Sequence, residues 1–417
     1  MKRVAVGLAA ALLCSAAAVG TASARDLVVT NARIVVGDGQ VIEKGSVVVH
    51  DDKIVSVAPG APASVPAGAQ TIDASGMTVM PGFIDVHRHL IRGDAAKWFA
   101  GPGAQQMMAL LEAGYTTVQS GGDETGAIVE LKKKVASGEI KGPRIIAAGW
   151  TRINTLKTEA EVRAAIDATI KAGADSIAEI IYPQAANPFA PTELERRNLP
   201  IAIDEAKKFN VPVQVHAVSP AAMVEAVRLG ATKLIHTPHY GWLTDEQAQE
   251  VAKAGAQVAS CTSFGSPVFG VFNKDNKPTF RDGRPWPQGV LGGEGRGREA
   301  GYKPVNARTL FDNGVTFGYC TDTTYDPRAG LAQELKVLNL TFSPIDLVKV
   351  MGPNSAALLD RTDIGELKAG KLADMVVLAG DPLEGYWNFL NAVVVVKGGE
   401  VMVDKRGQLQ TAKVLPN

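Results

Sequence analysis

Eight short strand candidates separated by helical segments constrain the fold of this chain more than any other feature. Each is a short run rich in apolar or β-branched residues, as is typical of strands buried on both faces of a sheet. Helical periodicity lies between several of them, at residues 159–172, 220–229 and 245–254. The strand candidates are a run that starts at Phe83 and residues 116–118, 144–147, 176–181, 213–216, 233–236, 257–260 and 315–319. This alternation predicts an α/β protein with a (β/α)8 TIM barrel, whose active site lies at the carboxyl ends of the strands.

The two ends of the chain differ from this middle part, because both are β-rich. Residues 27–57 contain short apolar runs separated by turn signals, and residues 373–378 and 392–396 repeat the pattern near the C-terminus. Such runs predict antiparallel strands joined by tight turns. We therefore expect residues 25–80 and 363–417 to form one composite, β-sandwich-like domain, and residues 81–362 to form the barrel.

The first residues predict export. Lys2 and Arg3 precede an apolar, alanine-rich stretch that ends near Val19, and small residues follow up to Ala24. This order is typical of a secretory signal peptide, here residues 1–24. A membrane anchor is the alternative, but the apolar stretch is short and alanine-dominated for a spanning helix. We therefore expect an exported mature protein without a membrane span, which in a bacterium is periplasmic.

Composition narrows the expected partners. The chain carries 43 basic and 43 acidic residues, and 46% of its residues are apolar, as in an ordinary globular protein. Because Lys and Arg are not clustered, neither nucleic acid nor an anionic membrane is indicated. A small-molecule substrate is therefore the expected partner, and a homo-oligomer stays open. After signal cleavage the cysteines are Cys261 and Cys320, so there is no disulfide framework, although a single bridge between them is possible.

Histidines and a carboxylate gather at the predicted strand ends. His87 and His89 stand two residues apart at the end of the first barrel strand, so their side chains point to the same face. His216 and His236 end two later strands, and Asp322 follows the last one. Taken singly, each is more often an ordinary core or surface residue. The joint pattern suits a divalent metal such as Zn²⁺, held by imidazole and one carboxylate with a position open to water.

The motifs around these residues resemble the amidohydrolase superfamily, and more narrowly its imidazolonepropionase-like and Xaa-Pro dipeptidase-like branches. The resemblance covers nearly all of the mature chain and rests on residues 81–89 (PGFIDVHRH), 114–118 (GYTTV) and 364–378 (IGELKAGKLADMVVL). It implies a barrel with a β-sandwich-like flank. It also implies one or two divalent metals held by His87, His89, His216, His236 and Asp322.

The fourth strand departs from this family's pattern. Relatives with two metals usually read Gly-Ala-Asp-x-Ile-Lys, with a carbamylated lysine that bridges the ions, whereas this chain has Ala178 at the lysine position. Glu179, the next residue, can bridge two metals if a bulge turns it inward. Simple alternation points it towards the helix layer, where an unpaired charge is costly, and this cost favours the bulge. The alternative is a single-metal site with Glu179 in a structural ion pair.

The expected ligands imply a hydrolytic mechanism. A metal lowers the pKa of bound water and polarises the substrate carbonyl. Asp322 is the candidate base, which takes a proton from the water and hands it to the leaving nitrogen. We expect His236 to complete the metal shell or to stabilise the oxyanion. His239 and Tyr240, on the loop that follows, are candidate substrate-binding residues, with plain loop packing as the alternative.

Residues 262–306, between the seventh and eighth strands, lack periodicity. Long irregular segments inside a compact domain are usually functional or disordered, and the aromatic residues of this one argue against disorder. We therefore expect a lid or specificity loop over the barrel mouth. Trp150 and Arg152, after the third strand, are candidates for another wall of the pocket.

Together these features predict a metal-dependent hydrolase that cleaves an amide bond in a dipeptide-like, N-acyl or cyclic amide substrate. A mononuclear deaminase of the same superfamily is the nearest alternative. It is disfavoured because residues 216–219 (HAVS) lack the nearby glutamate that deaminases use as a proton donor. A lactone or ester hydrolase is another alternative. A non-catalytic binding protein is the least expected, since it has no need of a carboxylate beside four imidazoles.

Overall fold

The computed structural model of the chain describes residues 26–183, 190–263, 296–324 and 326–408. The expected signal peptide, residues 1–24, lies outside the described residues, as do residues 264–295 of the expected lid. Within the described ranges, none of the helices combines the length and the hydropathy needed to cross a bilayer.

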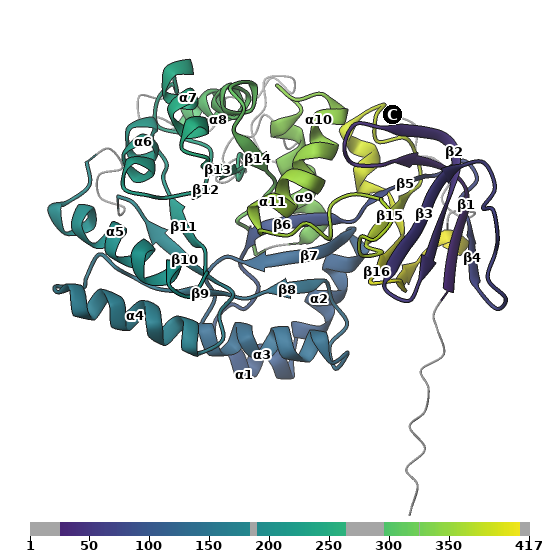
Figure 1. Cartoon of the computed structure of the whole chain (residues 1–417), viewed down its shortest axis with the longest axis horizontal. Coiled ribbons are helices and arrows are strands. Elements are labelled where there is room, and N and C mark those ends of the chain that lie inside the picture. Colours follow the sequence, from purple (N-terminus) through teal and green to yellow (C-terminus); the bar gives the residue numbers. More distant parts are fainter. Residues whose placement is uncertain (1–25, 184–189, 264–295, 325, 409–417) are drawn as a thin grey trace, which may run out of the picture.

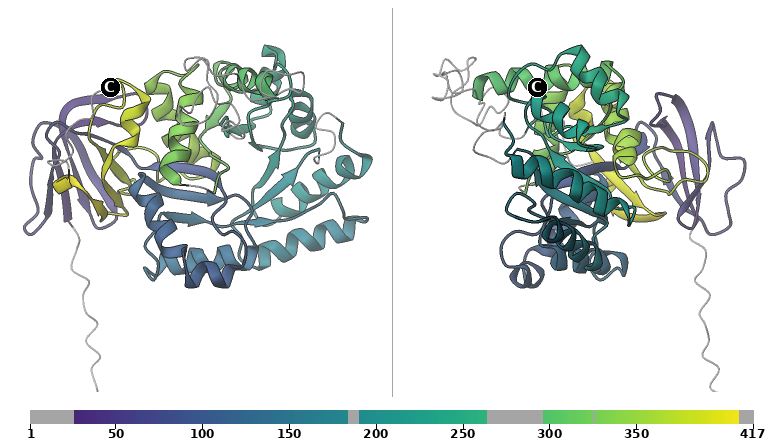
Figure 2. Two further views of the ribbon diagram at one scale, coloured as in Figure 1. Left: turned by 180° about the vertical axis from the view of Figure 1, so that it is seen from behind. Right: turned by 60° about the vertical axis from the view of Figure 1, so that its left-hand side comes forward.

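Strands from both ends of the chain share one sheet, in the order β17-β16-β15-β5-β1-β2-β3 with β4 paired to β1. Its core is built from apolar side chains of both regions, such as Val29, Ile34 and Val377, so each end buries its strands against the other. Figures 1 and 2 show these purple and yellow strands side by side at one end of the molecule. The strands are β1 (Asp26–Val35), β2 (Val41–His50), β3 (Lys53–Pro59), β4 (Gln70–Asp73), β5 (Thr78–Pro81), β15 (Met375–Leu378), β16 (Ala392–Lys397) and β17 (Glu400–Asp404).

The strands between these ends pair in parallel, which makes the chain an α/β protein. They form a three-stranded sheet, β6-β7-β8, and a six-stranded sheet, β14-β13-β12-β11-β10-β9. The two sheets are connected, because Ala147 alone separates β8 from β9 and the Val86 amide of β6 donates to the Tyr319 carbonyl after β14 at 3.1 Å. The strands are β6 (Phe83–Arg88), β7 (Tyr115–Ser120), β8 (Arg144–Ile146), β9 (Ala148–Trp150), β10 (Ser176–Ile181), β11 (Val213–His216), β12 (Lys233–Ile235), β13 (Gln257–Ala259) and β14 (Thr316–Gly318).

Each strand expected from the sequence is therefore present, with the third interrupted at Ala147. The helices expected at residues 159–172, 220–229 and 245–254 are also confirmed. Two of these helices and α5 begin at capping boxes, whose threonine hydroxyls accept from the third helical amide. The helices are α1 (Ala95–Ala100), α2 (Gly103–Glu112), α3 (Thr125–Ala136), α4 (Glu159–Lys171), α5 (Glu193–Lys207), α6 (Pro220–Arg228), α7 (Asp245–Lys253), α8 (Arg296–Asp312), α9 (Pro327–Leu338), α10 (Pro344–Lys349) and α11 (Ser355–Leu358), with a π-helical turn at Val350–Asn354.

Helix α8 corrects the expectation of an irregular stretch over residues 262–306. The helix begins at Arg296, so the last part of that stretch is regular. Its buried positions follow helical spacing and include Lys303, Asn306, Ala307 and Leu310. Because the first two are polar, the sequence lacks the regular apolar repeat by which a helix is predicted. Asn306 is buried because its amide donates to the carbonyls of residues 238 and 241, and so it anchors the loop after β12.

Candidate active site

Strand β6 carries the first two candidate ligands. Every residue of the strand is buried, and the His87 side chain is fully enclosed. The rings of His87 and His89 lie 5.6 Å apart between centroids and nearly perpendicular, on the same side of the strand. Asp85 fixes the strand end, because its carboxylate accepts from the His87 amide and from the amide and hydroxyl of Thr321. The strand therefore presents two imidazoles on a rigid support.

Glu179 is turned inward by a bulge, as its position in β10 predicted. The pairing of β10 with β11 shifts register between Ile177 and Ile180, and Glu179 has a left-handed backbone with φ +60°. Its Oε1 atom lies 3.3 Å from His89 Nε2 and 3.8 Å from His87 Nε2. Within the described part of the chain, its ion pairs are with these two imidazoles, and its role as a bridge between two metals or beside a single metal stays a prediction.

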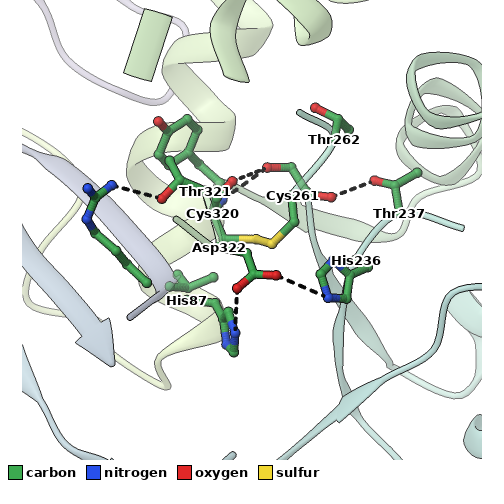
Figure 3. The surroundings of a disulfide bond; sticks show 12 residues. His87, His236, Thr237, Cys261, Thr262, Cys320, Thr321 and Asp322 are labelled. Carbon is green, nitrogen blue, oxygen red and sulfur yellow. Dashed lines mark hydrogen bonds and ion pairs between the residues drawn. A yellow bond between two sulfur atoms is a disulfide. The ribbon is translucent and has the colours of Figure 1, made fainter. Parts of the chain in front are cut away.

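Asp322 approaches the same two imidazoles as Glu179. Its backbone, with φ +49°, donates to the His87 carbonyl at 2.9 Å, and this bond holds the residue beside β6. Its Oδ1 atom lies 3.2 Å from His89 Nε2 and 3.6 Å from His87 Nε2, while Oδ2 lies 3.6 Å from His236 Nε2. Figure 3 shows the Asp322 carboxylate between His87 and His236. Asp322 therefore contacts imidazoles from two different strand ends.

His216 and His236 complete the group. His216 ends β11 and His236 follows β12, and the two rings approach at 2.9 Å between Nδ1 of His216 and Nε2 of His236. The His216 ring also packs edge-on against His87, 4.8 Å between centroids. Burial lowers the pKa of His216 well below its ordinary value and lowers that of His236 to about 4. Both imidazoles are therefore neutral near pH 7, the form that binds a metal.

This arrangement fits a divalent metal ion. One ligand atom from each of His87, His89 and Glu179 lies within 4.8 Å of the others. Both ring nitrogens of His87 and Nε2 of His216 are buried without a hydrogen-bond partner among the described residues, which is costly unless a ligand occupies them. Imidazole nitrogens beside carboxylate oxygens are the donor set that zinc and similar ions prefer.

The charges of the cluster agree with a cation site. Burial raises the pKa of Glu179, against the lowering effect of the His87 and His89 rings. Burial also opposes ionisation of Asp322, but the imidazoles beside it outweigh burial and hold the pKa of its carboxyl well below the ordinary value. Asp322 is thus ionised and able to accept a proton.

His239 lies beside His236, and Tyr240 lies beside His239. The His239 ring is 6.3 Å from His236 between centroids and 4.5 Å from the Tyr240 ring, and the backbone amides of both residues donate to Val218. Burial lowers the pKa of His239 to about 2. These contacts support loop packing as well as they support substrate binding, so the substrate-binding role stays a prediction.

Two glycines that sequence reasoning passed over make room for the ligands. Gly121 and Gly122 follow β7, and a Cβ at Gly121 would lie 2.9 Å from His87 Nε2. At Gly122, with φ +84°, a Cβ would lie 2.2 Å from Glu179 Cγ. The available signal was a glycine pair directly after a predicted strand, where the absence of a Cβ lets the backbone approach other groups closely.

A second network that sequence reasoning missed positions Asp322. The buried Arg88 guanidinium donates to the hydroxyls of Thr321 and Thr323, on either side of Asp322. Burial raises the pKa of the neighbouring Asp85 carboxyl to about 6, while Arg88 and Thr321 oppose that rise. The residue between the two histidines therefore supports the carboxylate that faces them.

Cys261 and Cys320 form a disulfide, which settles the question left open by the sequence. The bond is fully buried and joins the segments that follow β13 and β14 (Figure 3). Cys320 lies two residues before Asp322. Ser260 ties the same segments together, because its hydroxyl accepts from the Cys320 amide and donates to the Cys320 carbonyl. The strand end that carries Asp322 is thus held covalently.

Two cavities meet at His89. One, of ≈ 330 Å³, is lined by His89, Glu179 and Gly122 together with residues 150 and 152–154 and Ile181. The other, of ≈ 310 Å³, is lined by residues 88–90, part of α2 and the loop before α9. Both fall within the size range of small-molecule sites.

Comparisons with known proteins identify the family of the chain. A model described as the amidohydrolase family matches residues 78–265 and 303–404, more than two thirds of the chain. An imidazolonepropionase from Salinispora arenicola is 26% identical over 392 residues, which cover 84% of this chain and 89% of that protein. A crystal structure of an amidohydrolase matches with a TM-score of 0.75 at 22% identity, covering 91% of this chain and 100% of that chain.

A crystal structure of a Xaa-Pro dipeptidase with bound methionine in the active site also matches, with a TM-score of 0.73 at 22% identity, covering 90% of this chain and 99% of that chain. At this identity the two structures establish a shared fold. The resemblance inferred from the sequence motifs is confirmed, and both of the expected branches are represented.

Proposed function

The chain belongs to the amidohydrolase family and is a hydrolase that acts on carbon–nitrogen bonds, and from this premise we propose that it cleaves an amide bond in a dipeptide-like, N-acyl or cyclic amide substrate with a bound divalent metal. One observation carries the proposal: the carboxylates of Glu179 and Asp322 both approach Nε2 of His89, at 3.3 Å and 3.2 Å, next to a cavity of ≈ 330 Å³.

The architecture that we propose is a closed (β/α)8 barrel, residues 81–362, flanked by a composite β domain of residues 25–80 and 363–417. The parallel strands β6 to β14 and the hydrogen bond from Val86 to Tyr319 support closure. The shared sheet of β1–β5 and β15–β17 supports the composite domain. In this arrangement the ligands gather at the carboxyl ends of the strands, where barrel active sites lie.

Zinc is the metal that we propose, held by His87, His89, Glu179, His216, His236 and Asp322. Two ions are favoured over one, because Glu179 faces His87 and His89 and directly follows Ala178, the position at which relatives carry a bridging lysine. When bound, the metal would supply an activated water and a polarised substrate carbonyl. The imidazole nitrogens at the ends of three strands and the carboxylates at two others suit this role.

Asp322 acts as the proton shuttle in this proposal. Its carboxylate is ionised and lies beside His87, His89 and His236, so it can take a proton from water and deliver it to the leaving nitrogen. His236, which lies 3.6 Å from Asp322, completes the ligand shell or stabilises the oxyanion. His239 and Tyr240 face the substrate from the loop after β12.

We further propose that residues 1–24 are removed on export and that the mature protein acts in the periplasm. The Cys261–Cys320 disulfide supports this localisation, because such bonds persist in oxidising compartments. Cell fractionation and N-terminal sequencing test it. A mature chain that starts at Arg25 in the periplasmic fraction is expected, and a full-length chain confined to the cytoplasm would refute it.

The hydrolase proposal is tested by measuring the metal content of the purified protein together with hydrolysis of a panel of N-acyl amino acids, dipeptides, cyclic amides and lactones. We expect bound zinc and amide hydrolysis that chelation abolishes and zinc restores. Full activity of metal-free protein would refute the mechanism. Hydrolysis of lactones alone would assign the site to ester chemistry.

A further inference from the structure

One wall of the ≈ 330 Å³ cavity beside His89 and Glu179 is built by the segment directly after β9. Trp150 ends that strand and exposes 44% of its surface, which is unusual for so large an aromatic side chain. The Arg152 guanidinium lies over the Trp150 ring, 4.2 Å from its centroid. Stacking at this distance holds the planar guanidinium against the indole and restricts its orientation.

Within the described ranges, the Arg152 guanidinium has no hydrogen bond or ion pair and stacks on the Trp150 ring. Other arginines of the parallel region are used differently. Arg144, Arg163 and Arg196 each bind a carboxylate of the protein. Arg152 therefore presents a fork of donors to the cavity that holds the metal ligands.

We propose that Trp150 and Arg152 form an anion-binding subsite that holds a free carboxylate of the substrate next to the metal cluster. This inference rests on the proposed function and narrows it to N-acyl amino acids and dipeptides with a free C-terminal carboxylate. The guanidinium fork matches a carboxylate with two parallel hydrogen bonds. Trp150, Ile153 and Ile181 supply apolar surface for the amino-acid side chain in the same cavity.

The position of Glu179 in this cavity is compatible with an anionic ligand. Its carboxylate contacts the imidazoles of His87 and His89, so it faces these rings and the proposed metal rather than Arg152. Asn154 also lines the cavity and offers an amide that can donate to the same carboxylate. A substrate that carries a carboxamide in place of the carboxylate would lose the charge-assisted bonds to Arg152.

The test compares N-acetyl-L-leucine with N-acetyl-L-leucinamide on the zinc-loaded protein and on Arg152→Met, Arg152→Lys and Arg92→Met. Arg92 is a matched control, because it is an exposed arginine on the loop after β6 that lines neither cavity at His89. We expect wild-type kcat/KM for acetyl-group release to favour the free acid by roughly 10- to 100-fold. Arg152→Met should abolish this preference, Arg152→Lys should keep part of it, and Arg92→Met should leave it unchanged.

Calorimetric binding of the same two compounds to zinc-loaded and to chelator-treated protein separates this inference from the proposed function. If the wild type hydrolyses neither compound but binds the free acid more tightly than the amide, and Arg152→Met removes that difference, the subsite stands and the proposed reaction fails. Equal kcat/KM or equal binding of acid and amide overturns the subsite, as does a preference that survives in Arg152→Met. Failure of both compounds to bind also overturns it.

Discussion

Replacing Glu179 with glutamine tests the cation site directly, because it keeps the shape of the side chain and removes its charge. The Glu179 carboxylate lies within 3.8 Å of both β6 imidazoles, so a cation held by His87 and His89 would lie against it. Interactions with a charged group contribute roughly 1.5–3 kcal/mol each. We therefore expect Glu179→Gln to weaken zinc binding by roughly 10- to 100-fold. In the metal-free protein the change should be nearly neutral, because burial already raises the pKa of this carboxyl.

The assay is thermal unfolding in a zinc buffer set at 100 times the wild-type dissociation constant, compared with unfolding in chelator. At that ratio, binding stabilises the folded state by about 2.7 kcal/mol, whereas a 100-fold weaker variant gains about 0.4 kcal/mol. For a chain of 417 residues the unfolding entropy is roughly 0.9 kcal/mol/K, so the zinc-dependent shift in Tm falls from about 3 °C to about 0.5 °C. Direct titration gives the affinity independently.

Glu334→Gln is the matched control, since Glu334 is a buried glutamate whose carboxylate accepts from the backbone amides of Thr262 and Ser263 and forms no ion pair with the imidazoles among the described residues. It should lower the Tm of the metal-free protein and leave the zinc-dependent shift unchanged. A zinc-dependent shift in Glu179→Gln that equals the wild-type shift would reject Glu179 as a ligand. An unchanged zinc stoichiometry would reject its bridging role.

Three further predictions concern the strand ends. Asp322→Asn should reduce kcat by roughly 10²- to 10⁴-fold in protein that still contains zinc, and wild-type kcat in this variant would exclude Asp322 as the shuttle. Replacing Cys261 and Cys320 with serine opens a loop of 59 residues. This should lower the free energy of unfolding by roughly 4 kcal/mol and Tm by roughly 5 °C. An unchanged Tm in differential scanning calorimetry would contradict this expectation. Gly122→Ala should weaken zinc binding in a titration, because the added Cβ displaces the Glu179 side chain. Gly138→Ala is the control, since Gly138 has a similar φ of +80° but no atoms within 4 Å of the added Cβ. Equal zinc affinities of the two variants would refute the steric argument.

The strands and the clustering of most candidate site residues were predictable from the sequence, because both depend on local patterns. Buried strands are rich in apolar and β-branched residues, and such residues mark the strands that end at His216 and just before His236, namely Val213, Val215, Leu234 and Ile235. Histidines at the ends of parallel strands then meet at one edge of the sheet. The structure brings His87, His89, His216, His236 and Asp322 into contact for this reason.

The features that escaped prediction depend on contacts between distant segments. Lys303 and Asn306 occupy the buried face of α8, so the sequence of this helix does not show the apolar repeat that predicts a helix. The buried Asn306 amide donates hydrogen bonds to carbonyls of the loop after β12, which lies more than sixty residues away in the sequence. Likewise, a disulfide between Cys261 and Cys320 follows from the neighbourhood of β13 and β14, which spacing alone leaves open.

Backbone strain links the fold to the site. Four non-glycine residues in or just after the parallel strands have left-handed backbones: Glu179 with φ +60°, His236 with φ +77°, Cys261 with φ +40° and Asp322 with φ +49°. Each such residue costs roughly 1–2 kcal/mol, and it persists where the surroundings enforce it. Three of the four carry the candidate chemistry, and the fourth is bonded to Cys320, two residues before Asp322. The disulfide, the backbone bond from Asp322 to His87 and the bulge in β10 therefore maintain a conformation that the isolated strands would not adopt, and this conformation turns the carboxylates towards the imidazoles.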